Sequence, residues 1–178
     1  IDIKENKLNL NGIVKRSRAI AKKLSNGIEY LFKKNNIQLI YGTAKITKNK
    51  ELIITKNDKE EKLLAKNIII ATGAGPKKIK VSEDYEKLGL WDYFDAMTPN
   101  QIPKSLGIIG SGAIGIEFAN FYSSLGSEVI VFEMANEILP NEDFEISSFL
   151  RKSLIKKGVK FHLNSSVIDI KEKEGLEL

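Results

Sequence analysis

The sequence predicts an α/β protein in which a parallel βαβ unit follows one helix and an antiparallel β-meander. Three observations support this order. Residues 13–35 place apolar side chains at helical spacing, with lysines on the opposite face. Residues 37–71 contain three β-rich runs that are separated by polar turns. From residue 104 onward, short apolar runs alternate with longer amphipathic ones, which is the pattern of parallel strands joined by helices.

The meander is predicted from its strand-like runs and the turns between them. The segments KNKE and KNDKE are rich in the polar residues that suit hairpin turns. The third run includes Ile68, Ile69 and Ile70, and so continuous an apolar stretch predicts a strand that is buried on both faces. The three runs cover residues 37–47, 51–55 and 61–71.

Residues 77–103 are interpreted as a connector between two domains. The segment is rich in lysine at its start and contains Pro99 and Pro103. Its aromatic residues Trp91, Tyr93 and Phe94 are expected to pack it against the rest of the chain. We therefore predict one domain over residues 1–103 and a second over 104–178.

The second domain alternates strands and helices. Gly126 follows the first of its helices at the position where a left-handed C-terminal cap belongs. The second helix has acidic residues in its first turn and lysines in its last, as the helix dipole favours. The predicted strands cover 106–109, 129–133, 159–163 and 167–171, and the predicted helices cover 113–125 and 142–157.

Composition excludes several classes of protein. The 178 residues contain no cysteine, so the chain has no disulfide framework and no thiol nucleophile. No apolar run approaches the roughly 18 residues of a membrane span, and we expect a cytoplasmic protein without a membrane partner. Residues 1–80 carry 19 Lys or Arg against 7 Asp or Glu. Because these cations are scattered without interleaved aromatic residues, we do not expect nucleic-acid binding, although a basic binding module stays an alternative.

The motif GxGxxG at 110–115 predicts a dinucleotide site. It follows a strand and opens a helix, and Glu133 ends the next strand. Gly110 permits a tight turn, Gly112 lets the backbone approach a pyrophosphate, and Gly115 allows close helix packing. Glu133 is expected to accept hydrogen bonds from both hydroxyls of the adenosine ribose. It repels a 2′-phosphate, and no arginine follows within residues 134–136, so a Rossmann-type unit with a preference for NAD is predicted. The alternative is a Rossmann-like turn that binds nothing.

The ordered motifs of the chain resemble a known family. The segment IPKSLGIIGSGAIGIEFANFYSSLGSEVIVFE, followed by ILPNEDFEISSFLRKSLIKKGVKF, is similar to the NAD-binding domain of dihydrolipoyl dehydrogenases. These enzymes belong to the FAD-dependent pyridine nucleotide–disulfide oxidoreductases. The upstream segments GTAKIT, AKNIIIATGAGP and WDYFDAMTP resemble the same family, so the similarity covers nearly the whole chain. It implies that residues 1–103 belong to an FAD-binding domain.

The resemblance implies a role for particular residues. Glu117 matches a glutamate between the flavin and the nicotinamide, and Val167 matches an apolar residue near the adenine. Thr43 and Ala44 match backbone contacts to the adenine of FAD. Residues 72–74 match a turn that approaches FAD, where the family often has serine in place of Ala74. The alternatives are an exposed first-turn acid for Glu117 and ordinary turn chemistry for the FAD positions. His162 has no implied role, and no catalytic or metal-binding residue is predicted. The implied cofactor-binding residues are Gly110, Ser111, Gly112, Ala113, Ile114, Gly115, Glu117, Glu133, Val167, Thr43, Ala44, Thr72, Gly73 and Ala74.

The family's redox cysteine pair, its FAD-binding glycine motif and its C-terminal dimerisation domain have no counterpart in this sequence. We therefore expect an internal part of a longer enzyme that is inactive by itself. The resemblance implies that the parent passes electrons from a dihydrolipoyl group through a disulfide and FAD to NAD⁺. Its implied partners are the lipoyl domain of a 2-oxo acid dehydrogenase complex and a second copy of itself. Another FAD- and NADH-dependent reductase or oxidase of the same two-domain fold stays an alternative, and a CxxxxC segment encoded shortly before Ile1 would favour the dehydrogenase.

Overall fold

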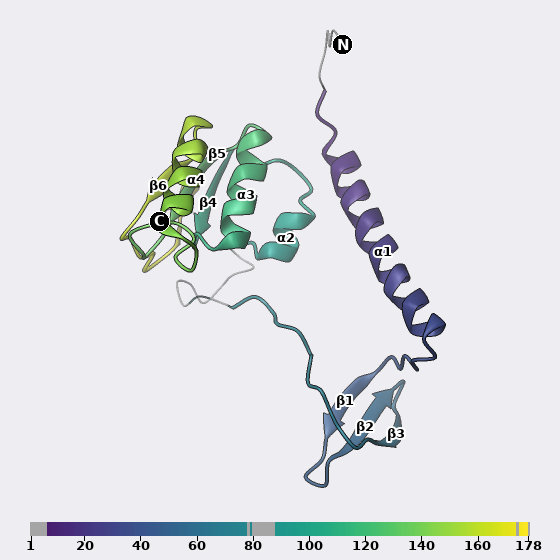
Figure 1. Ribbon diagram of the computed structural model, residues 1–178. Helices are drawn as coiled ribbons and strands as arrows, with labels where there is room; N and C mark the ends of the chain where they lie inside the picture. The colour runs from purple at the N-terminus through teal and green to yellow at the C-terminus, as the bar shows by residue number, and fades with distance from the viewer. Residues whose placement is uncertain (1–6, 78, 80–87, 174, 178) are drawn as a thin grey trace. The chain divides into compact units, whose positions relative to one another are not determined.

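The computed structural model describes residues 7–77, 79, 88–173 and 175–177 (Figure 1). The chain divides into two units. One comprises Arg16–Gly75, and the other holds the described residues up to Lys15 and from Pro76 onward. This division falls earlier than the predicted domain boundary at residue 103, and the assignment of 1–103 to an FAD-binding domain stays a prediction. Residues 78 and 80–87 of the predicted connector lie outside the described residues.

Helix α1 (Leu10–Lys34) begins three residues before the predicted start. The side chain of Asn9 explains the earlier start, because its Oδ1 accepts a hydrogen bond from the Gly12 N–H at 2.8 Å and so caps the first turn. The helix ends where Asn36 adopts a left-handed conformation, with φ of 55°. The predicted helix is therefore confirmed, with an N-terminal cap that the apolar spacing did not reveal.

The meander forms a three-stranded antiparallel sheet of β1 (Thr43–Ile46), β2 (Glu51–Lys56) and β3 (Lys59–Leu64) (Figure 1). Strand β2 lies in the centre, with Ala44 opposite Ile54 and Ile54 opposite Glu61. The turn between β2 and β3 consists of Asn57 and Asp58, both with positive φ. Such a two-residue turn matches the twist of the strands, which is why β3 starts two residues before its predicted position.

The prediction of a buried strand at Ile68–Ile70 is wrong. Strand β3 ends at Leu64, and the described chain has no regular element from residue 65 to 77. Ile69 is 90% exposed and Ile70 is 72% exposed. A continuous apolar run is buried only where neighbouring strands and a covering layer exist, and the three-stranded sheet provides neither beyond β3.

The second unit contains the predicted parallel sheet, in the order β4 (Ser105–Ile109), β5 (Glu128–Phe132) and β6 (Lys160–His162). Helix α3 (Ala113–Ser124) connects β4 to β5, and α4 (Phe144–Lys156) connects β5 to β6. The two helices lie beside each other on the sheet (Figure 1), and Lys157 Nζ donates to Asn120 Oδ1 at 2.8 Å between them. The α/β fold class with a parallel βαβ unit is thus confirmed.

The core of this unit lies between the central strand and the two helices. Strand β5 directs Val129 and Val131 into it, and both are almost completely buried. On helix α3 the side chain of Ile114 is 54% exposed. The buried face of this helix is instead formed by Ile116, Ala119 and Tyr122, because the glycine at 115 occupies the position nearest the strand.

The end of the connector packs onto the parallel sheet unit through Ala96 and the Trp91 ring, whereas Phe94, which was also expected to pack, is 55% exposed. The short helix α2 (Tyr93–Met97) begins with an Asp92 capping box. The hydroxyl of the fully buried Tyr122 donates to the Ala96 carbonyl oxygen at 2.7 Å, and the Trp91 ring lies 6.2 Å from the Tyr122 ring. Burial raises the pKa of the Tyr122 hydroxyl, so this donor keeps its proton.

The last predicted strand differs from the structure. Residues 167–170 form no strand, and a hairpin of β7 (Lys171–Lys173) and β8 (Gly175–Glu177) follows them. The Asp169 carboxylate accepts a hydrogen bond from the Ile170 N–H at 2.9 Å. A side chain that binds the local backbone competes with strand pairing, which explains why the apolar alternation did not produce a strand there.

Candidate dinucleotide site

The motif at 110–115, hereafter the nucleotide loop, joins β4 to α3. Gly110 has a φ of 97°, a conformation that strongly favours glycine, and its N–H donates to the Phe132 carbonyl oxygen at 2.8 Å. A Cβ atom at residue 115 would clash with the Gly110 carbonyl oxygen. A Cβ atom at Gly112 would have no neighbour within 4 Å. The first and third glycines are therefore required by the turn and the helix packing, whereas the space beside the second is open.

The N-terminus of α3 offers free donors next to that open space. Gly112 is the N-cap residue, and no side chain caps the first turn. The N–H groups at the start of a helix lack intrahelical partners and carry a partial positive charge, which suits a phosphate group. The arrangement fits the pyrophosphate of a dinucleotide, which needs close approach to the backbone at Gly112.

Glu133 directly follows β5, and its carboxylate reaches back to the nucleotide loop. Oε2 accepts a hydrogen bond from the Ser111 N–H at 2.8 Å and from the Ser111 hydroxyl at 2.7 Å. Oε1 accepts one from the Ala135 N–H at 2.8 Å. The Glu133 backbone is held as well, because its N–H donates to the His162 carbonyl oxygen at 2.9 Å. The acidic residue is thus fixed in place beside the loop.

The surroundings of Glu133 keep it ionised. Its partial burial would raise the pKa of the carboxyl, but the hydrogen bonds from Ala135 and Ser111, together with the nearby N–H of Met134, outweigh this effect and hold the pKa below its ordinary value. A carboxylate that is charged at neutral pH accepts hydrogen bonds from hydroxyl groups and repels a phosphate. Met134 is exposed and Ala135 is small, so the residues that follow bring no positive charge to this point.

A backbone hydrogen bond from Leu139 also holds the nucleotide loop. The carbonyl oxygen of the fully buried Ser111 accepts a hydrogen bond from the Leu139 N–H at 3.0 Å. The segment before Leu139 is anchored by Glu137, which is only 5% exposed and pairs with Arg151 of α4 through two hydrogen bonds of 2.6 and 3.0 Å. No local sequence pattern connects these two residues, because they lie on different elements 14 positions apart.

The remaining residues predicted for the NAD site lie on or after these elements. Ala113 and Ile114 form the exposed first turn of α3. Glu117 is exposed and lies five residues after the N-cap, beyond the first helical turn, so the interpretation of Glu117 as a first-turn acid is wrong. Val167 is half-buried in the irregular segment before β7. His162 is exposed on β6, where its ring stacks on Phe132 with centroids 5.2 Å apart.

The residues predicted to contact FAD lie in the other unit. Thr43 and Ala44 are exposed on β1, opposite Thr55 and Ile54 of β2. Residues 72–74 form an exposed irregular segment in which Gly73 has a φ of 76°. Contacts through the backbone need an accessible main chain, and both segments meet this condition. Their assignment to FAD depends on the sequence resemblance.

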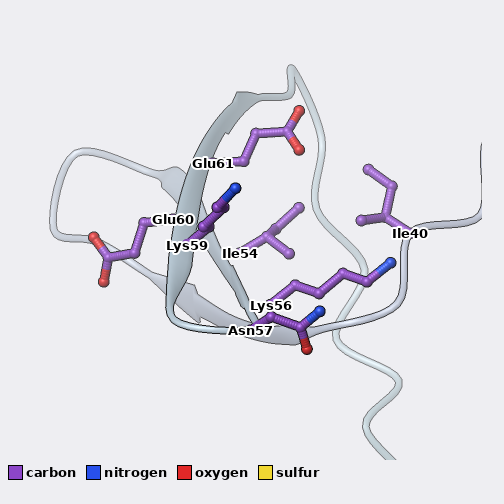
Figure 2. Close-up of a pocket in the computed structure, with 7 residues that line it drawn as sticks. All are labelled: Ile40, Ile54, Lys56, Asn57, Lys59, Glu60 and Glu61. Atoms are coloured by element: carbon purple, nitrogen blue, oxygen red, sulfur yellow. The ribbon is translucent and has the colours of Figure 1, made fainter.

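The meander unit also contains a hollow with a volume of about 330 Å³ (Figure 2). Figure 2 shows Ile40 on one side and Ile54 on the strand opposite, with charged side chains from β2 and β3 around them. None of the residues predicted to bind a cofactor lines this hollow. Its lining consists of Ile40, Ile54, Lys56, Asn57, Lys59, Glu60 and Glu61.

Neither a metal-binding cluster nor a membrane-spanning helix is found among the described residues. No three His, Asp or Glu side chains within them gather closely enough to hold a metal ion. No helix in this part of the chain is both long and apolar enough to cross a membrane.

A comparison with protein families shows to which family the chain belongs. The family described as pyridine nucleotide-disulphide oxidoreductase matches residues 3–178. The chain belongs to this family. The match includes the nucleotide loop, Glu133 and the meander, so the resemblance predicted from the motifs is confirmed.

Relatives and similar solved structures cover both units. The dihydrolipoyl dehydrogenase of Rhizobium etli is 42% identical over 92% of this chain and 37% of its own length, and that of Zymomonas mobilis is 41% identical over 89% and 34%. The HOCl-induced flavoprotein disulfide reductase RclA from Escherichia coli has a TM-score of 0.74 at 27% identity, covering 88% of this chain and 36% of that one. LpdA from Mycobacterium tuberculosis, at 22% identity, shares the fold with a TM-score of 0.82 over 97% of this chain and 39% of that one. The chain thus spans about a third of the length of the relatives that it matches.

Proposed function

We propose that this chain is the nucleotide-binding part of a dihydrolipoyl dehydrogenase and that it binds NAD(H) at the nucleotide loop and Glu133. The observation that carries the proposal is the ionised Glu133 carboxylate held beside the loop by Ser111. The open space at Gly112 and the free N–H groups of α3 suit the pyrophosphate, and the carboxylate suits the ribose hydroxyls. Glu117 would lie toward the nicotinamide and Val167 toward the adenine.

FAD is the second cofactor in this proposal. Thr43 and Ala44 would contact its adenine, and Thr72, Gly73 and Ala74 would approach it through their exposed backbone. When bound, FAD supplies the electron transfer between a dithiol and the nicotinamide, while the protein positions the two cofactors. Dithiol oxidation also needs a cysteine pair, and the 178 residues contain no cysteine. We therefore assign cofactor positioning, and no redox step, to residues of this chain.

The wider role follows from the relatives and stays part of the proposal. The parent enzyme oxidises dihydrolipoyl groups of a 2-oxo acid dehydrogenase complex, reduces NAD⁺, acts as a homodimer and is cytoplasmic. The 178 residues alone should not catalyse NADH-dependent reduction of lipoamide, and detectable turnover would contradict this. A disulfide reductase with another substrate is the second candidate, supported by the structural similarity to RclA. Both candidates need a cysteine pair, so the reaction of the parent enzyme distinguishes them: NAD⁺ reduction with dihydrolipoamide supports the dehydrogenase, and its absence favours the second candidate.

Titration of the chain with NADH and NADPH tests the nucleotide site. We expect NADH to bind at least about tenfold more tightly, since a 2′-phosphate next to an ionised carboxylate is repelled. Glu133→Gln should weaken NADH binding and reduce the discrimination. Glu128→Gln, at the opposite end of β5, removes an exposed carboxylate and should change neither affinity. Equal affinities of the wild-type chain for the two nucleotides would refute the proposed NAD preference.

A further inference from the structure

The hydrogen bonds of Glu133 limit what its carboxylate can still accept. An ionised carboxylate has about four lone-pair positions. Three are occupied within the protein: two on Oε2 by the Ser111 N–H and hydroxyl, and one on Oε1 by the Ala135 N–H. The Met134 N–H also lies close enough to lower the pKa of this carboxyl. Two ribose hydroxyls need two acceptor positions, so the carboxylate cannot accept both unless one internal donor leaves.

The internal donors differ in their freedom to leave. The N–H groups of Ser111 and Ala135 belong to the backbone, which the surrounding hydrogen bonds hold: the Ser111 carbonyl oxygen binds the Leu139 N–H, and the Ala135 carbonyl oxygen binds the Asn164 N–H. The Ser111 hydroxyl is attached through a single rotatable bond. Rotation about this bond releases Oε2 without moving the main chain.

We propose that the Ser111 hydroxyl is an affinity-determining group of the dinucleotide site, because it competes with the adenosine ribose for the same oxygen of Glu133. This inference rests on the proposed function, since it assumes that NAD(H) binds beside Glu133. The two backbone donors already orient the carboxylate, so the hydroxyl adds stability to the protein at the expense of ribose binding. Removing it should therefore change affinity and stability in opposite directions.

The Ser111→Ala variant tests the competition. Hydrogen bonds to charged groups are among the stronger ones in proteins, so removal of this competitor should lower the Kd for NADH about five- to tenfold. Thermal unfolding should occur at a lower temperature, because the Glu133 carboxylate loses one internal donor. If the serine instead served to orient Glu133, the same substitution would weaken NADH binding, so the sign of the change separates the two roles.

A matched variant and a matched ligand sharpen the test. Ser127 is also buried, and its hydroxyl donates to the Pro103 carbonyl oxygen at 2.6 Å at the start of β5. Ser127→Ala should lose stability without any gain in affinity. An NADH analogue that lacks the adenosine 2′-hydroxyl needs only one acceptor position, which the carboxylate still has. With this analogue the gain of Ser111→Ala should disappear.

The outcomes separate this inference from the proposed function. A tighter Kd of Ser111→Ala for NADH, but not for the 2′-deoxy analogue, supports the inference. If the wild-type chain binds NADH and Ser111→Ala binds it equally or more weakly, the inference is overturned and the proposed function stands. If the wild-type chain does not bind NADH, both are overturned. Should Ser111→Ala fail to fold, Ser111→Cys replaces the hydroxyl by a weak thiol donor of similar size, and the same sign is required of it.

Discussion

Replacing Arg151 by methionine leaves the Glu137 carboxylate without its partner. Glu137 is 5% exposed, and the guanidinium of Arg151 donates to both of its oxygens at 2.6 and 3.0 Å. Removing one member of a buried ion pair costs roughly 3–5 kcal/mol, because the remaining charge is buried without compensation. The Arg151 side chain is 26% exposed, so water can reach part of the site. We therefore expect Arg151→Met to lower the free energy of unfolding of the parallel sheet unit by about 3 kcal/mol.

A double variant that also replaces Glu137 is the control for this prediction. Glu137 also accepts a hydrogen bond from the Ile138 N–H at 2.9 Å. The double variant Glu137→Gln/Arg151→Met removes the unpaired charge and keeps an acceptor for that N–H. It should recover most of the lost stability, to within about 1 kcal/mol of the wild type. Lys156→Met, an exposed cation of the same helix, should change the stability by less than about 1 kcal/mol.

Urea unfolding monitored by tryptophan fluorescence measures these changes. The chain has one tryptophan, Trp91, whose ring lies beside Tyr122 in the parallel sheet unit. Its emission therefore reports on the unit that contains the ion pair. A loss below about 1 kcal/mol for Arg151→Met, or a double variant as unstable as the single one, would refute the argument that an uncompensated carboxylate is responsible.

Three further predictions follow from the same structure. Gly115→Ala should lose about 1–3 kcal/mol in urea unfolding and most NADH binding, because its Cβ meets the Gly110 carbonyl oxygen. Gly112→Ala should keep its stability within about 1 kcal/mol but lose NADH binding. An equal loss of stability in the two variants would be inconsistent with the different space around the two glycines. Tyr122→Phe should cost about 1–2 kcal/mol by the same method, since the Ala96 carbonyl oxygen loses its donor, and an unchanged urea midpoint would argue against a packed connector. The pKa of the Glu137 carboxyl is held below its ordinary value, chiefly by the hydrogen bond from Arg151. The carboxylate therefore stabilises the folded protein fully at pH values above its ordinary pKa, and this stabilisation is lost as the pH falls through the lower folded-state pKa. Glu137→Gln should flatten the acid limb of the stability–pH curve, whereas an unaltered curve would exclude this carboxyl as its cause.

Local sequence patterns predicted the elements that depend on local physics. The glycine spacing at 110–115 identified the turn from β4 to α3. Gly110 adopts a left-handed conformation, Gly115 has no space for a Cβ atom, and glycine suits both positions. Periodicity identified α1 and the parallel strands. The same reasoning was wrong for Ile68–Ile70, because an apolar run does not reveal whether neighbouring strands exist to cover it.

The sequence by itself determined the family, the order of α1, the meander and the βαβ unit, and the acidic residue at the end of β5. It listed Ser111 as part of a motif without giving its side chain a role. Only the tertiary structure showed that the N–H and the hydroxyl of Ser111 both donate to one carboxylate oxygen of Glu133, 22 residues away. The same holds for the pair of Arg151 and Glu137, which anchors the segment before Leu139. The reason is physical. Backbone conformation and apolar spacing are set by residues a few positions apart, whereas a hydrogen bond between loops depends on how the strands and helices between them bring those loops together.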